Sequence, residues 1–346
     1  MSTAVIGQLK RIPTLDQMRG YAIFGMLLVN AKGLFHLNAP QLSHHRESFT
    51  YADTIAPLFM FVVGMGMRLS WLRRSAQAGD GVARKAMAKR FAVLVLIAFV
   101  IYSGYLWDAL MDIGLAGLLA LPFIHRSVRA RVLAAFGMVA LYQVLCMFTV
   151  YGQWVTRAVK FGEDNTPLLV RLVPLKDALF DVALNGGPLG PLSWCMMLLF
   201  GTVAYDLLAA GNQRKFLAGC LGWGTTLCAA GYLLRLEWPG VKAAWPFSAY
   251  YMTAPFPLWA TGLCFFHLVG FYLLCDKLHL RIPTLTAVGM NPLFIYILQC
   301  LVLDVAESFR PEKLSLATGI AGFALFYVLF AGLAYYLCRR RIFIKI

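Results

Sequence analysis

The segment HHRESFTYADTIAPLFMFVVGMG, residues 44–66, decides how the rest of the chain is interpreted. A polar run with two adjacent histidines leads directly into a long apolar stretch that starts near Asp53. An acid is favoured at a helix N-terminus, and Pro57 is tolerated there because the first N–H groups have no helical partner. The pattern predicts a membrane helix with His44 and His45 in the loop just outside it, where titratable groups are candidates for chemistry. An ordinary interfacial loop is the alternative.

The composition places this segment in a membrane protein. Of 346 residues, 60% are hydrophobic and 14% are charged, whereas soluble domains carry roughly 25% charged residues. The charges lie in short breaks between long apolar runs, which indicates an all-α, polytopic integral membrane protein. The net charge of +15 does not indicate a nucleic-acid partner, because the basic residues lie in the connections, as the positive-inside rule requires.

We predict about ten transmembrane helices, since a span needs about 20 apolar residues. An even number places both termini on one side. That side carries 21 of the 31 lysines and arginines, so both termini are predicted to be cytoplasmic and the two histidines to lie on the opposite face. We expect one domain over residues 1–346, in the cell inner (plasma) membrane. The predicted spans are 20–36, 53–72, 91–107, 109–124, 132–150, 191–210, 216–234, 252–275, 289–306 and 317–338.

Polar residues within or beside the spans are candidates for function because they are costly in a bilayer. Asp16 and Arg19 are three residues apart, which favours an interfacial salt bridge, while the arginine could instead face an anionic ligand. Asn30 needs a partner on a neighbouring helix or a substrate. Asp112 could cap a helix or orient a histidine, and capping is the simplest interpretation of Asn291.

Other parts of the sequence say less about chemistry. The long connection 151–190, on the predicted outer side, could be a lid, an acceptor-binding loop or a linker. The eight cysteines are scattered without a CxxC pair, so we expect neither a disulfide framework nor a metal site. The sequence has no HExxH, P-loop or GxSxG motif, so zinc hydrolysis, nucleotide hydrolysis and α/β-hydrolase chemistry have no support.

Several motifs together resemble a known family. LDQMRG at residues 15–20, MLLVN ending at Asn30, and the run from Asp53 to Gly64 are similar to the opening of the transmembrane acyltransferases related to heparan-alpha-glucosaminide N-acetyltransferase. Weaker similarities follow over most of the chain: DIGLAG at 112–117, GPLSW at 190–194, ATG at 260–262 and GMNP at 289–292.

The resemblance implies that an acetyl or other acyl group passes from cytosolic acetyl-CoA, a substrate, to a sugar or amino sugar across the membrane. An outer-loop histidine, here His44 or His45, would be the acyl carrier or general base. HHRESF stands where the family has HxxWxG, so the resemblance leaves open which histidine acts. An imidazole can take the acceptor's proton near neutral pH or form an acyl-imidazole.

The resemblance also maps further site residues onto this chain. Asp53 follows the histidine loop, Asn30 is the family's VN asparagine and could donate to an oxyanion, and Asp16 with Arg19 belongs to LDxxRG. Arg19 is our candidate for the phosphates of CoA.

Two other functions remain alternatives: a transporter or flippase for an envelope lipid or sugar, and a scaffold without catalysis. A transporter would show charges along a path and broken helices in matched halves. The expected partners are the bilayer and a glycan acceptor, with no nucleic acid and no metal; a homodimer is left open.

Overall fold

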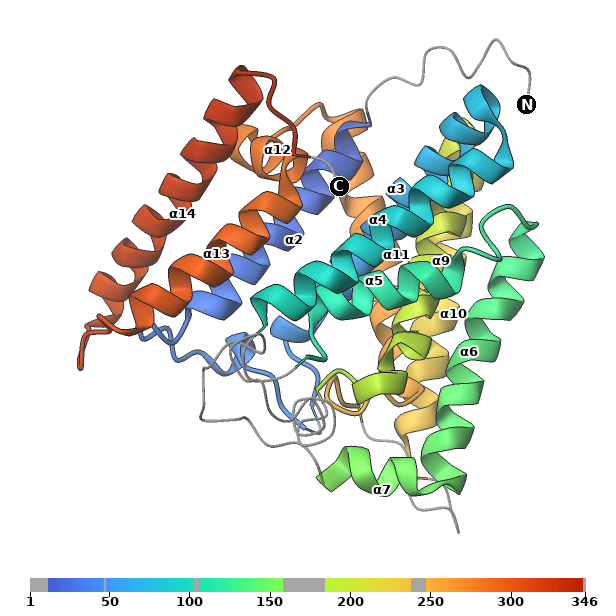
Figure 1. Ribbon diagram of the computed structural model, residues 1–346, viewed down its shortest axis with the longest axis horizontal. Helices are drawn as coiled ribbons and strands as arrows, with labels where there is room; N and C mark the ends of the chain where they lie inside the picture. Colours follow the sequence, from blue (N-terminus) through green and yellow to red (C-terminus); the bar gives the residue numbers. More distant parts are fainter. Residues whose placement is uncertain (1–11, 47, 103–105, 158–183, 238–246, 345–346) are drawn as a thin grey trace. The chain divides into compact units, whose positions relative to one another are not determined.

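The computed structural model describes residues 12–46, 48–102, 106–157, 184–237 and 247–344, and every regular element within these ranges is helical (Figure 1). The all-α fold class is therefore confirmed for the described part of the chain. Three short elements are η1 (Pro40–Leu42), η2 (Gly187–Leu189) and η3 (Leu273–Lys277). The α-helices are α2 (Pro13–Ala31), α3 (Ala52–Ala78), α4 (Asp80–Ile101), α5 (Ala109–Ala120), α6 (Val128–Phe148), α7 (Val150–Arg157), α9 (Gly190–Ala209), α10 (Gln213–Arg235), α11 (Pro255–Tyr272), α12 (Pro283–Met290), α13 (Pro292–Glu307) and α14 (Leu316–Arg339).

Six of the described helices are long and apolar enough to cross a bilayer: α3, α6, α9, α10, α11 and α14. The pair α12 and α13 makes a seventh if the two count as one broken span, because they are bent by 89°. Each of the ten predicted segments holds a helix. Of the described helices, only the six named above, or seven with the bent pair, are long and apolar enough to cross a bilayer. The chain is a multi-pass membrane protein, while the count of ten and the cytoplasmic termini stay predictions.

Several helices have bounds that differ from those of the predicted spans, and two of the differences affect residues discussed below. The first helix begins at Pro13 rather than Gly20, so its polar start is part of the helix. The segment 289–306 is not one helix, because the chain bends at Asn291. Its side chain does not cap α13; it donates to Ile342 O at 3.1 Å and accepts from Ile344 N at 2.9 Å. The expected helix cap is therefore absent at Asn291, and its buried amide instead binds the backbone of the C-terminal segment.

Contacts divide the chain into two compact units, which we describe separately. The first unit comprises the described residues of His45–Phe49 and Met60–Phe266. Within it, α9 contacts α5, α6 and α10 and is buried along most of its length. A Cβ at Gly201 would lie 2.0 Å from Phe61 O of α3, so only glycine allows this approach of the two backbones.

The second unit comprises Ile12–His44, Thr50–Phe59 and His267–Ile346. Its central helix α2 contacts α12, α13 and α14, although these lie about 270 residues later in the chain (Figure 1). A Cβ at Gly20 would lie 1.9 Å from Leu285 O, and one at Gly289 would lie 2.0 Å from Asp16 O. These two glycines bring α2 and α12 together and so fix the helix that leads into the histidine loop.

Candidate active site

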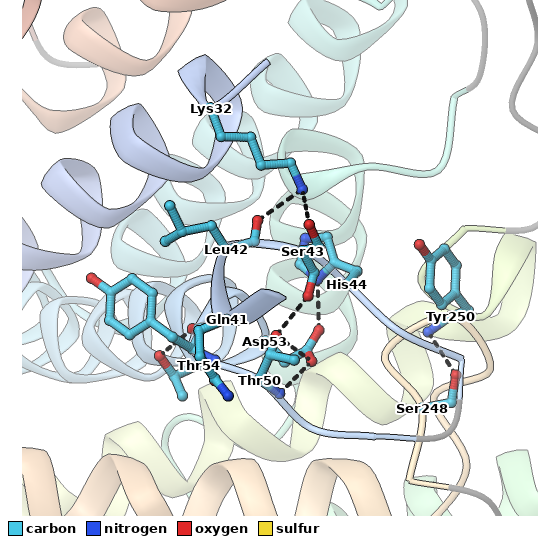
Figure 2. A network of polar contacts seen from close by, with 11 residues as sticks. Lys32, Gln41, Leu42, Ser43, His44, Thr50, Asp53, Thr54, Ser248 and Tyr250 are labelled. Atoms are coloured by element: carbon cyan, nitrogen blue, oxygen red, sulfur yellow. Dashed lines mark hydrogen bonds and ion pairs between the residues drawn. The ribbon is translucent and has the colours of Figure 1, made fainter. Parts of the chain in front are cut away.

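The outer-loop histidine that contacts the helix acid is His44. Its Nδ1 lies 2.6 Å from Asp53 Oδ1, in the first turn of α3 (Figure 2). The carboxylate is buried, at 1% side-chain exposure, while the imidazole is 42% exposed. An ionised carboxylate only accepts hydrogen bonds, so this contact favours the tautomer with its proton on Nδ1 and its lone pair on Nε2. A histidine oriented in this way is suited to accept a proton or attack a carbonyl carbon.

The second carboxylate oxygen of Asp53 is held by Thr50. The Thr50 backbone N–H donates to Oδ2 at 2.9 Å, and the Thr50 hydroxyl lies 3.1 Å from the same oxygen. That hydroxyl is also 2.8 Å from Ser43 O, next to the histidine. Both carboxylate oxygens therefore have a donor, which prevents the group from rotating away from His44.

Lys32 holds the other end of the loop. Its Nζ donates to Leu42 O and to Ser43 Oγ, each at 2.8 Å, directly before His44 in the chain (Figure 2). This lysine, which the sequence reading did not single out, connects the end of α2 to the histidine loop. The segment VNAKG, residues 29–33, could have indicated this contact, because a lysine at the end of an apolar helix needs either a hydrogen-bond partner or solvent.

Two further candidates, His45 of the histidine loop and Asn30 of α2, are both exposed. His45 is exposed, and it is His44 that lies on Asp53. Asn30 is exposed near the end of α2, and no hydrogen bond among the described residues joins it to His44 or Asp53. Of the two partners considered for Asn30, a neighbouring helix supplies no hydrogen bond to it in the described part of the chain, and a substrate stays the prediction.

Asp16 and Arg19 form the predicted ion pair, with Nη1 3.5 Å from Oδ1. The same guanidinium donates to Gly289 O at 3.3 Å, at the end of α12. A cation is favoured by the carbonyl groups that point out of a helix C-terminus. The arrangement is that of an anchor between α2 and α12, and the phosphate-binding role of Arg19 stays a prediction.

Asp112 belongs to the first unit, and among the described residues it neither caps a helix nor contacts a histidine. Asp108 is the N-cap of α5, whose first turn holds Asp112. Asp112 Oδ2 accepts from Asn185 Nδ2 at 3.0 Å, while Oδ1 is buried without a partner in the described ranges. Asn185 has a left-handed backbone, with φ of 53°, at the end of the long connection. Most of that connection, 158–183, lies outside the described residues.

A second charged group in the first unit was missed by the sequence analysis. Arg68 of α3, Arg131 of α6 and Asp206 of α9, which we call the arginine cluster, meet in an ion-pair network. The lone acid in the apolar run LLFGTVAYDLLAA was the available signal, because an acid in such a run needs a cationic partner.

Comparison with known proteins places these residues in a family. Residues 11–228 match the family described as heparan-alpha-glucosaminide N-acetyltransferase, catalytic. That is more than half of the 346 residues. The chain belongs to the heparan-alpha-glucosaminide N-acetyltransferase family. The resemblance inferred from LDQMRG and the histidine loop is thereby confirmed.

Membership in this family indicates that the protein is a membrane acyltransferase. It includes the histidine loop, its acid and the arginine cluster, since all of them lie between residues 11 and 228. A curated relative, the "Uncharacterized 39.9 kDa protein in amylase 3'region" of Bacillus acidopullulyticus, is 31% identical over 120 residues. That alignment covers 33% of this chain and 34% of the relative, so the two are compared over about a third of their lengths.

Proposed function

We propose that this protein transfers an acyl group from acyl-CoA on the cytoplasmic side to a hydroxyl or amino group of a sugar on the opposite side. The observation that carries the proposal is the contact between His44 Nδ1 and the buried Asp53 carboxylate. The membership in an acetyltransferase family supports acetyl-CoA as donor and a glycan as acceptor. A location in the cell inner membrane belongs to the same proposal.

Two routes use this geometry. In direct transfer, His44 Nε2 removes the acceptor's proton while the acceptor oxygen or nitrogen attacks the thioester carbon; the C–S bond then breaks and CoA leaves as a thiolate that takes up the proton. In the two-step route, Nε2 itself forms a bond to the acyl carbon as the C–S bond breaks and CoA leaves as a thiolate. The acceptor then attacks the acyl carbon, the C–Nε2 bond breaks, and the acceptor's proton passes to the freed Nε2 and on to water, from which the CoA thiolate takes up one proton. In both, Asp53 stabilises the positive charge that develops on the imidazole.

The developing oxyanion needs a donor, and Asn30 is our candidate because it lies two residues before Lys32 at the same end of α2. Loss of one such donor typically slows the reaction about 100- to 1,000-fold. Its exposed amide leaves it accessible to a substrate.

The test is release of CoA from acetyl-CoA by the purified protein with a panel of amino sugars and hydroxylated sugars. We expect His44→Ala to abolish release and His45→Ala to retain most of it, since it is His44 that contacts Asp53. Release that is lost in His45→Ala and kept in His44→Ala would reverse the assignment. Release that is unaffected by either change would place the chemistry elsewhere.

Transport of an envelope lipid or sugar stays the second candidate. The bent pair of α12 and α13 is the one broken span found among the described helices, whereas matched halves would supply two. Absence of CoA release with every acceptor, combined with movement of a labelled lipid or sugar across reconstituted vesicles, would favour this function.

A further inference from the structure

The arginine cluster joins three helices of the first unit at their predicted cytoplasmic ends. Arg68 Nε donates to Asp206 Oδ1 at 2.9 Å, and Arg131 Nη2 pairs with Asp206 Oδ2. Arg131 Nη1 also donates to Thr202 Oγ1 at 2.7 Å, and Arg68 Nη1 donates to Ile124 O at 2.6 Å. One carboxylate thus serves two guanidinium groups, one on each oxygen.

The charges of the cluster do not balance. Arginine keeps its charge in proteins, so two guanidinium groups and one carboxylate leave an excess positive charge. Both arginines form their ion pairs with Asp206 alone in the described part of the chain. The Arg131 side chain is 1% exposed, and its Nε is buried without a partner among those residues. An excess charge that is partly removed from water is stabilised by an anion.

The surroundings add positive charge. Arg131 lies in the first turns of α6, where the helix N-terminus favours an anion. Arg73 lies within electrostatic range of Tyr205, which also interacts with Arg68 and Asp206. No acid other than Asp206 is ion-paired with the cluster in the described ranges.

The neighbouring connection between α5 and α6 is basic too. His125 follows Ile124, whose carbonyl holds Arg68, and its ring lies 6.2 Å from that of Trp71. Burial lowers the pKa of His125, the nearby charges of Arg126 and Arg84 lower it further, and Asp80 raises it, so two of the three charges that act on this ring are positive.

A ligand can reach the cluster from its edge. The side chains of Arg68 and Asp206 are 14% and 22% exposed, in contrast to the enclosed Arg131. A guanidinium binds phosphate oxygens through parallel N–H donors, and basic pockets between membrane helices on the cytoplasmic side bind phosphate head groups.

We propose that the arginine cluster binds a phosphate group, with Arg68 as the residue that reaches it. Two sources carry this chemistry on the cytoplasmic side: the phosphates of an acyl-CoA donor and the head group of an anionic phospholipid. The donor source rests on the proposed function; the lipid source does not. The cluster is distinct from Arg19, which belongs to the second unit.

The test compares Arg68→Gln with Arg74→Gln, a matched loss of one charge at an exposed arginine of the same helix. Arg68→Lys keeps the positive charge but lacks the parallel N–H donors of the guanidinium, and it serves as a folding control. Binding of unacylated CoA is measured by calorimetry, in detergent without anionic lipid. Stabilisation by lipid is measured as the rise in Tm between neutral phosphatidylcholine nanodiscs and nanodiscs with phosphatidylglycerol.

We expect Arg68→Gln to weaken one of the two interactions about tenfold or more, the usual effect of losing a charge-assisted hydrogen bond, and Arg74→Gln to change it less than about twofold. Weaker CoA binding identifies the donor, and a lost phosphatidylglycerol effect identifies the lipid. CoA binding and lipid stabilisation that both match wild type in Arg68→Gln would overturn the proposal. Neither measurement requires acyl transfer, so a protein that binds CoA through Arg68 without releasing it from acetyl-CoA would contradict the proposed function and leave this site standing.

Discussion

Asp53→Asn is the sharpest perturbation of the candidate active site, because it changes a charge and a donor pattern with almost no change in shape. The native carboxylate accepts from His44 at one oxygen and from the Thr50 N–H at the other. An asparagine has one oxygen only, so one of these two groups must face its NH₂. The outcome depends on which of them loses its acceptor.

The Thr50 N–H is buried and cannot change its role, whereas an imidazole can change tautomer. Leaving the buried N–H unpaired costs about 1–3 kcal/mol, so the amide oxygen is expected to face Thr50 and the amide NH₂ to face His44. The histidine must then accept at Nδ1 and carry its proton on Nε2. In that tautomer Nε2 can neither take a proton nor attack the thioester. We expect kcat to fall about 100- to 10,000-fold.

The assay is steady-state CoA release with a saturating acceptor, together with thermal unfolding of each variant in detergent. Asp304→Asn, at an exposed acid of α13, is the control for loss of a carboxylate. An unfolding temperature close to wild type would show that the loss of rate comes from the tautomer. If Asp53→Asn kept more than about a tenth of the wild-type kcat, the carboxylate would not control the histidine, and the reasoning would be refuted.

Two further predictions concern the supports of the site. Lys32→Met removes both donors to the loop at Leu42 and Ser43, and we expect a fall in kcat of about tenfold that Lys32→Arg partly restores, measured by CoA release; a normal rate in Lys32→Met would contradict this role. Gly20→Ala places a Cβ against Leu285 O and is expected to destabilise the protein by about 1–3 kcal/mol in denaturant titrations, whereas Gly332→Ala, which meets nothing within 4 Å, should not; equal effects would contradict the close packing of α2 and α12.

The sequence predicted the helical class and ten segments that each hold a helix, because long apolar runs are a strong signal, but it did not predict the short helices α7 and α12. It also predicted that a histidine and Asp53 stand at the start of α3. It could not choose between His44 and His45, because that choice depends on how the loop returns, through Lys32 and Thr50, to the helix. These contacts depend on the folded path of the loop, and no motif or residue spacing in the sequence indicates them.

The break at Asn291 shows a second limit. GMNPL reads as a helix start with a cap, since asparagine before proline is a common capping pattern. The buried amide instead bonds to backbone groups of Ile342 and Ile344, more than 50 residues later. A local pattern identifies where a helix must stop, but the partner that satisfies the side chain is set by the tertiary fold.

The arginine cluster makes the same point for charge. Asp206 stands alone in an apolar helix, so the sequence requires a partner for it, and positive residues on the same predicted side are numerous. The structure selects Arg131 and Arg68, which are 75 and 138 residues away. Because one acid receives two cations, the network carries an excess charge that no inspection of single residues reveals. The function of these residues therefore has to be argued from their joint charge, and that charge is what makes a phosphate the expected ligand.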